Sequence, residues 1–302
     1  MKPKLQYWID LDKVFFSPTF TRQTITGPER TVWILLPPRG CPVGCPYCSC
    51  RNLRSNIRPS EENSREFIDQ ISCWLRREHL PETVKISNAG NLFHGSEFGG
   101  RMEIHENFWN LLISVLSISP ISKVEVETTI PDLASTQLAT PHGITKQRFI
   151  NFVQILRDAG KEPRAILVLE YASDLMVELG KSKPEDTQTA TASAIEAGAL
   201  ALREGACEVI VNCQYVDPLN RWEAERDGIP FYLPNETDIH QVAKALLDCH
   251  LSGRIRISAD AEPIIYGTLG PRLSPEFRHL IQQFNEAPDQ RGFYQAHFTK
   301  SS

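Results

Sequence analysis

No run of apolar residues in this 302-residue chain approaches the ~20 that a membrane-spanning helix requires. The N-terminal stretch MKPKLQYWIDLDKVFF mixes charged with apolar side chains and has no small-residue cleavage site, so we expect no signal peptide. An excess of positive charge is also lacking, because 37 aspartates and glutamates outnumber 32 lysines and arginines, and the net charge of −5 at pH 7 disfavours nonspecific binding to nucleic acid. We therefore expect a cytoplasmic protein that has no membrane partner.

Half of the eight cysteines stand close together, in the stretch RGCPVGCPYCSC at residues 39–50. They are Cys41, Cys45, Cys48 and Cys50. Because cytosolic thiols stay reduced, a cluster of this kind indicates metal binding or catalysis before it indicates disulfides. A structural zinc site with four thiolate ligands is one interpretation, and it would make Cys50 the fourth ligand.

The remaining cysteines are isolated from this cluster and from one another: Cys73, Cys207, Cys213 and Cys249. Structural zinc sites usually join two separated cysteine pairs, and this sequence lacks a second pair. We expect Cys73, Cys207 and Cys249 to be small residues of the core.

Short β-branched runs alternate along the chain with segments of helical periodicity. The runs are RTVWILL (30–36), TVKISN (83–88), KVEVET (123–128), RAILVLE (164–170), EVIVN (208–212) and RIRIS (254–258). Helices are predicted after Ser60, from about Glu106, from Thr145 to Gly160, over 187–204, over 237–250 and from Ser274-Pro275. Such strand–helix units predict a parallel α/β fold, and both an open doubly wound sheet and a barrel-like curve fit the pattern.

No charge block, low-complexity tract or Pro/Gly linker divides the chain. We therefore predict one catalytic domain over residues 30–285, an N-terminal extension over 1–29 and a C-terminal tail over 286–302 that folds back on the domain. The cysteine cluster directly follows the first predicted strand. Parallel α/β proteins build their sites at the carboxyl ends of their strands, so we expect the functional site there.

The spacing of the first three clustered cysteines suits iron better than zinc. Three thiolates on one tight loop can hold three irons of a 4Fe–4S cluster and leave the fourth iron open. The amino and carboxylate groups of S-adenosylmethionine (SAM) can chelate that open iron. In this chain, Cys41-Pro-Val-Gly-Cys45-Pro-Tyr47-Cys48 resembles the C-x-x-x-C-x-x-C signature of the radical SAM superfamily, including the aromatic residue before the third cysteine.

This resemblance covers roughly residues 30–285 and implies a partial (β/α)6 TIM-like barrel of parallel strands. Within the superfamily, the stretches GCPYC, KISNAG and VEVETTIPD most resemble the group that contains the elongator tRNA-modifying subunit and the archaeosine-synthase radical subunit. The resemblance implies that Cys41, Cys45 and Cys48 bind the 4Fe–4S cluster. Cys50 is then left over beside it.

The resemblance also implies a pocket for SAM across the carboxyl ends of the strands. The residues that we assign to it are Tyr47, Asn88, Ala89, Gly90, Asn91, Glu127, Glu170 and Asn212. The turn at 88–91 would meet the methionyl amino group, although it departs from the acidic Gly-Gly-Glu form of many members. Glu125 shares a strand face with Glu127, and we favour Glu127 because it lies nearer the strand's end. A buried carboxylate here needs a partner, which we expect to be the sulfonium or the ribose of SAM.

The implied activity is reductive cleavage of SAM at the cluster to a 5′-deoxyadenosyl radical, which abstracts hydrogen from a substrate. It requires an external one-electron reductant of the flavodoxin or ferredoxin type. The substrate is left open between an RNA nucleoside, on tRNA, and a small metabolite, and a partner subunit would supply a basic surface for RNA. The rival hypothesis is a structural zinc- or cluster-binding module that does not cleave SAM.

Overall fold

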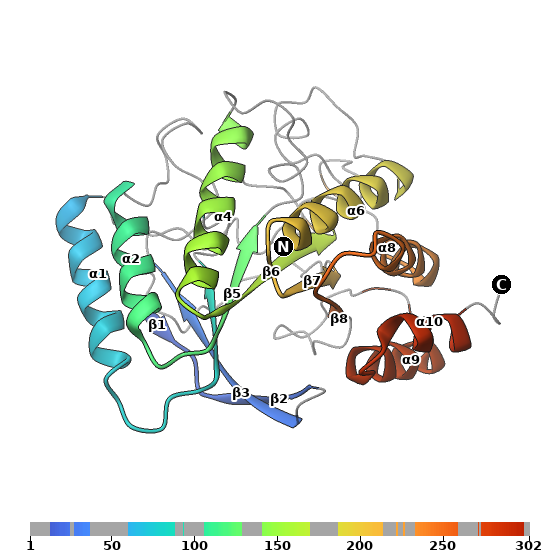
Figure 1. The fold of residues 1–302 in the computed structure, drawn as a ribbon, viewed down its shortest axis with the longest axis horizontal. Coiled ribbons are helices and arrows are strands. Elements are labelled where there is room, and N and C mark those ends of the chain that lie inside the picture. Colours follow the sequence, from blue (N-terminus) through green and yellow to red (C-terminus); the bar gives the residue numbers. More distant parts are fainter. Residues whose placement is uncertain are drawn as a thin grey trace.

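The protein is described by a computed structural model (Figure 1). It describes residues 13–24, 27–36, 60–87, 93, 106–128, 141–169, 187–213, 222, 226, 233–258, 271 and 273–298. Within these residues, one eight-stranded sheet forms the centre of the molecule. No described helix has both the length and the apolar character needed to cross a membrane.

Six of the strands run parallel and follow one another across the sheet in chain order. They are β3 (Gly27–Leu35), β4 (Thr83–Ser87), β5 (Lys123–Thr128), β6 (Glu162–Leu169), β7 (Glu208–Cys213) and β8 (Arg254–Ser258). Each corresponds to one of the β-branched runs in the sequence. The parallel α/β prediction is therefore confirmed.

Two short strands, which the sequence patterns did not predict, extend the sheet beside β3. They are β1 (Phe15–Phe16) and β2 (Phe20–Thr24), and both pair with β3 in the antiparallel direction. The segment that we expected to be a mere N-terminal extension thus adds strands to the sheet. Their few residues lack the strict period-2 pattern of a half-buried strand, so hydrophobic periodicity did not reveal them.

The described helices connect or follow the strands. They are α1 (Glu61–Trp74), α2 (Glu106–Ile118), α4 (Pro141–Asp158), α6 (Thr187–Arg203), α8 (Glu236–Asp248), α9 (Pro275–Glu286) and α10 (Gln290–His297). Local signals in the sequence located most of their starts: Ser60 and Ser274 accept hydrogen bonds as N-caps of α1 and α9. The predicted start at Thr145 was wrong, because α4 begins one turn earlier at Pro141, as the preference of proline for a first turn allows.

The two faces of the sheet differ in chemistry. Right-handed crossovers between strands that progress in one direction place their helices on the same face. On that face, Val84, Ile86, Val124 and Val126 are fully buried. The alternate residues, among them Glu125, point to the opposite face, which we call the inner face. The inner face carries the charged residues described below.

The far edge of the sheet is covered by side chains from the C-terminal helices. Gln290 accepts a hydrogen bond from the Ile255 N–H (3.0 Å) and donates to the Ile255 carbonyl, while Asn285 does the same for Ile257 (2.9 Å each). These two amides replace a neighbouring strand for β8. Among the described strands β8 pairs only with β7, so the sheet is open here and closure into a barrel is not seen.

The C-terminal residues fold back on this side of the sheet. Tyr294 and Phe298 are buried, their rings stack 4.9 Å apart, and both stack on His240 of α8. The prediction that two of the isolated cysteines belong to the core was wrong, because Cys73 and Cys249 are exposed. Cys73 faces outward on α1 although its neighbours Ile71 and Trp74 are buried, and Cys249 is the C-cap at the exposed end of α8.

Candidate functional site

The carboxyl edge of the parallel strands is the place where the cysteine loop leaves the sheet. β3 ends at Leu35, and the next residue, Leu36, donates its backbone N–H to the carbonyl of Ser87 at the end of β4 (2.8 Å). The chain is described again from Ser60, the N-cap of α1. The loop of residues 37–59, with all four clustered cysteines, is therefore connected to this edge at its start.

Most of the residues that we assigned to the metal and SAM sites lie outside the described residues. These are Cys41, Cys45, Tyr47, Cys48, Asn88, Ala89, Gly90, Asn91 and Glu170, and the unassigned Cys50 also lies outside the described residues. Their assignments stay predictions. Within the described residues, no group of three His, Cys, Asp or Glu side chains is close enough to hold a metal ion.

Glu127, the carboxylate favoured from the sequence, lies at the carboxyl end of β5. Its side chain is 22% exposed, and its Oε2 lies 3.7 Å from the Lys85 ammonium and 3.4 Å from the donating hydroxyl of Ser87. The Lys85 ammonium also lies over the Trp33 ring, 5.3 Å from its centroid. The protein thus provides Glu127 with a loose cationic partner of its own, which leaves carboxylate oxygen accessible to a ligand.

Asn212 lies on the same face as Glu127 and closer to the carboxyl edge. In the parallel register Glu127 pairs with Ile166, and Asn212 pairs with Val168, which stands two residues further along the same strand. Residues two apart on a strand share a face. The side chain of Asn212 is partly exposed, so its amide can donate to or accept from a ligand at this edge.

Glu125 has a different role from its neighbour Glu127. Its side chain is 2% exposed, and it pairs with Arg22 from β2 (2.5 Å), Arg164 from β6 (3.1 Å) and Arg256 from β8 (3.6 Å). We expected a ligand to be the partner of an inward carboxylate on this strand. For Glu125 that partner is instead a set of arginines from the chain itself, so the preference for Glu127 as the ligand-binding carboxylate stands as a prediction.

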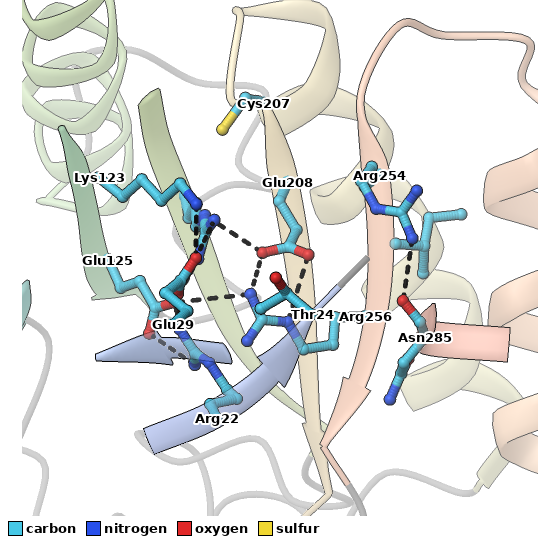
Figure 2. A network of polar contacts seen from close by, with 12 residues as sticks. Arg22, Thr24, Glu29, Lys123, Glu125, Cys207, Glu208, Arg254, Arg256 and Asn285 are labelled. Carbon is cyan, nitrogen blue, oxygen red and sulfur yellow. Dashed lines mark hydrogen bonds and ion pairs between the residues drawn. The ribbon is translucent and has the colours of Figure 1, made fainter. Parts of the chain in front are cut away.

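Glu125 belongs to a larger buried network on the inner face, shown in Figure 2. Its members, each joined to the rest by ion pairs, are Arg22, Glu29, Lys123, Glu125, Arg164, Glu208 and Arg256. The hairpin of β2 and β3 brings Arg22 and Glu29 onto the sheet, where Glu29 pairs with Lys123 (2.6 Å) and Arg164 (2.8 Å). The alternating charges of KVEVET and RIRIS hint at such a row, but their partners come from distant segments.

The network shifts the ionisation of its own members. Burial alone raises the pKa of Glu29, but hydrogen bonds and attraction from Arg164 and Lys123 outweigh it and hold that pKa far below its usual range. Burial likewise raises the pKa of Glu125, and the attraction of Arg22 and Arg256 reverses the shift to a lowered value. The pKa of Arg164 is raised, since its carboxylate partners outweigh burial. All these groups therefore stay charged at neutral pH.

One ion pair of the network spans several strands of the sheet. On a flat sheet, β5 and β8 would be separated by three strand spacings, about 14 Å. The Arg256 guanidinium nevertheless lies 3.6 Å from the Glu125 carboxylate. The two long side chains extend toward each other on the inner face, so the network links β5 directly to β8.

No protein-family model matches the chain. No curated protein matches it significantly in sequence.

Proposed function

We propose that the chain is a radical SAM enzyme whose core is a partial (β/α)6 TIM-like barrel. One observation carries the proposal: the C-x-x-x-C-x-x-C loop leaves the sheet at the carboxyl edge where Glu127 and Asn212 lie. In parallel α/β proteins this edge is where cofactors and substrates bind. The chain order of the parallel strands β3 to β8 supports the barrel-like interpretation, because a (β/α) barrel has this strand order.

The chemistry of the predicted donor set fits the proposed group. Cys41, Cys45 and Cys48 would supply three thiolates, which suit a 4Fe–4S cluster with one iron open to SAM. When bound, such a cluster supplies one-electron reductive cleavage of SAM, with methionine and a 5′-deoxyadenosyl radical as products. An external reductant of the flavodoxin or ferredoxin type would deliver the electron.

The described residues would bind and orient SAM. Glu127 offers carboxylate oxygen to the ribose hydroxyls or to the ammonium of SAM, and Asn212 offers a neutral amide nearer the edge. Ile166 and Ile210 stand next to each other in the register between these residues and present apolar surface. An apolar wall of this kind helps to exclude water and competing hydrogen donors from a radical.

The ion-pair network forms the floor of the proposed cavity. Its carboxylates are saturated by arginine and lysine side chains from β2, β5, β6 and β8, so they are poor bases and poor ligands for a cofactor. Its role is structural, because its ion pairs connect strands of the open sheet that are not neighbours. Catalysis and recognition are thereby confined to the carboxyl edge, above the floor.

The decisive experiment is anaerobic reconstitution of the protein with iron and sulfide, followed by dithionite and SAM. The expected product is 5′-deoxyadenosine, measured by liquid chromatography. Its formation should be abolished in Cys41→Ala, Cys45→Ala and Cys48→Ala and retained in Cys50→Ala. Cys73→Ala is a matched control, because that thiol is exposed on α1.

Two results would contradict the proposal. In the first, the purified protein holds one zinc ion, loses it in Cys50→Ala and makes no 5′-deoxyadenosine, which would assign the loop a structural role. In the second, 5′-deoxyadenosine formation survives Cys45→Ala unchanged. If 5′-deoxyadenosine forms as expected, a reduction of SAM affinity in Glu127→Gln, measured by equilibrium dialysis of the reconstituted protein, would locate the pocket on β5.

A further inference from the structure

A cavity of about 290 Å³ opens at the amino edge of the sheet, beside the start of β8. Its walls come from the ends of α6 and α8, the first residues of β8 and the turn between α9 and α10. Pockets for drug-sized ligands hold about 300–1,000 Å³, so this cavity suits a small metabolite. The proposed reaction belongs to the carboxyl edge, and a ligand bound here is therefore neither its cofactor nor its substrate.

Arg254, the first residue of β8, brings to this cavity a positive charge that no carboxylate pairs with. Its Nη2 donates to the carbonyls of Asn285 (2.9 Å) and Ala287 (3.1 Å), the first of which Figure 2 shows. In the part of the chain that the structure describes, its Nε and Nη1 have no acceptor and no carboxylate stands within ion-pair distance. Burial lowers the pKa of Arg254, and the attraction of Glu208 does not restore it. This half-buried guanidinium can therefore still bind an anion.

Arg291 and Asp289 add one charge of each sign at the start of α10. The half-buried Arg291 donates to the Leu247 carbonyl (2.5 Å) and contacts Nδ1 of His250 (2.5 Å), which fixes its guanidinium and leaves its Nε unused. Asp289 is exposed, and its Oδ1 accepts the Gly292 N–H (3.0 Å) as the N-cap of α10. Neither residue makes an ion pair with another described residue, so the charges that line the cavity are not used up by one another.

Another part of the cavity wall is apolar. Leu202 of α6 and Leu246 of α8 are buried in the core, and Leu247 and Leu251 are half-buried and pack against it. Apolar surface beside a few charged groups is typical of a site for a small organic molecule. An inorganic ion would leave this surface uncovered.

We propose that this cavity binds a small α-amino acid with an apolar side chain. The carboxylate of the ligand accepts hydrogen bonds from Arg254 and Arg291, its ammonium pairs with Asp289, and its side chain packs on the leucines. A simple anion would leave the carboxylate of Asp289 without a partner, and a simple cation would leave both arginines without one. A zwitterion of this size matches the charges of both signs and the volume of the cavity.

Gln290 connects this cavity to the sheet, because it lines the cavity and its amide caps β8 at Ile255. A ligand that binds only the folded protein raises its stability, and here the bound amino acid covers the cap of the open edge. The amino acid thus acts as an effector on the fold, and the inference depends neither on the cluster nor on SAM.

Isothermal titration calorimetry of the full chain with L-leucine measures binding, and thermal unfolding followed by circular dichroism measures the stabilisation. We expect a saturable heat and a melting temperature that rises with the concentration of L-leucine. Isocaproate lacks the ammonium group of leucine and isoamylamine lacks the carboxylate, while both keep its apolar part. Each should bind about tenfold more weakly than L-leucine, because one charged contact is lost.

Two variants remove charges of the site one at a time. Arg291→Met removes one partner of the ligand carboxylate, and Asp289→Asn removes the charge that meets the ammonium but keeps a side chain that can cap α10. We expect about tenfold weaker binding of L-leucine in each variant. Arg65→Met is the matched control and should bind L-leucine like the wild type, since Arg65 is 68% exposed and pairs with Glu61 on α1.

Three results would overturn the assignment. The first is the absence of both a saturable heat and a rise in melting temperature at about 10 mM L-leucine. The second is wild-type affinity for L-leucine in both Arg291→Met and Asp289→Asn. The third is binding of isocaproate as tight as that of L-leucine, which would make this a site for a simple anion. None of these measurements needs iron, sulfide or SAM, so failure of the enzymatic proposal and failure of this one are distinguishable.

Discussion

Replacement of Glu125 by glutamine tests the buried network most directly. The carboxylate is 2% exposed and lies between Arg22, Arg164 and Arg256. Glutamine has nearly the same shape, but it removes the negative charge and presents an NH2 group to a guanidinium. The three arginines then share an enlarged excess of positive charge in a buried site. Breaking a buried ion pair in this way costs about 3–5 kcal/mol, which is a large part of a typical domain's stability.

The pH dependence of stability gives the same prediction a second readout. The pKa of Glu125 is lowered from its usual value of 4.5 in the folded protein, so the unfolded chain binds more protons just below that pH. The contribution of Glu125 to stability is therefore fully present above about pH 4.5 and is lost as the pH falls through the lower folded pKa. The pKa of Glu29 is also lowered in the folded protein, so its contribution to stability is likewise lost as the pH falls. The free energy of unfolding of Glu125→Gln should therefore fall less steeply than that of the wild type from about pH 5 to about pH 3.

Urea denaturation followed by circular dichroism at pH 7 and across the acid range measures both effects. Glu61→Gln is the control, because Glu61 is 49% exposed and pairs with an exposed arginine one turn away on α1. Its free energy of unfolding should change by less than about 0.5 kcal/mol. A Glu125→Gln protein with wild-type stability at pH 7 would refute the reasoning, since the carboxylate would then contribute nothing to holding the sheet.

Three further predictions concern other parts of the fold. Gln290→Leu should cost about 1–3 kcal/mol in urea denaturation and cause self-association in light scattering, because it exposes the paired edge of β8. Gly253→Ala, at φ 119° with backbone carbonyls near the added Cβ, should cost roughly 2–3 kcal/mol, whereas Gly160→Ala, at φ 72° in open space, should cost about 1. Burial raises the pKa of the Cys207 thiol to about 12, so iodoacetamide at pH 8 should alkylate the exposed Cys73 and spare Cys207.

Each of these has a result that would contradict it. A monomeric Gln290→Leu protein of unchanged stability would mean that the edge of β8 does not depend on its amide cap. Equal losses of stability in Gly253→Ala and Gly160→Ala would show that the backbone carbonyls near Gly253 do not add to the cost of its replacement. Peptide mass spectrometry that finds Cys207 modified as fast as Cys73 would show that this thiol is not held in its buried, protonated form.

The sequence predicted the parts of the molecule whose signals are local. β-branched runs of five to seven residues located the six parallel strands, because β-branched side chains favour the extended backbone of a strand. Cap residues such as Ser60 and Ser274 located helix starts, since a cap satisfies backbone groups within its own turn.

Other features of the protein depend on pairs of residues that are far apart in the chain, and only the tertiary structure decided them. Glu125 and Glu127 have the same pattern in the sequence, yet Arg22 and Arg256 arrive from opposite ends of the chain to bury one and leave the other open. The pairing of β2 with β3 and the amide cap of Gln290 on β8 are long-range contacts of the same kind. Periodicity reports which face a side chain occupies, but only the folded arrangement determines which charge it meets there. The sequence by itself thus determined the strands and the cysteine motif, and the tertiary structure decided which of the two carboxylates is buried among arginines, because pairing depends on distance in space.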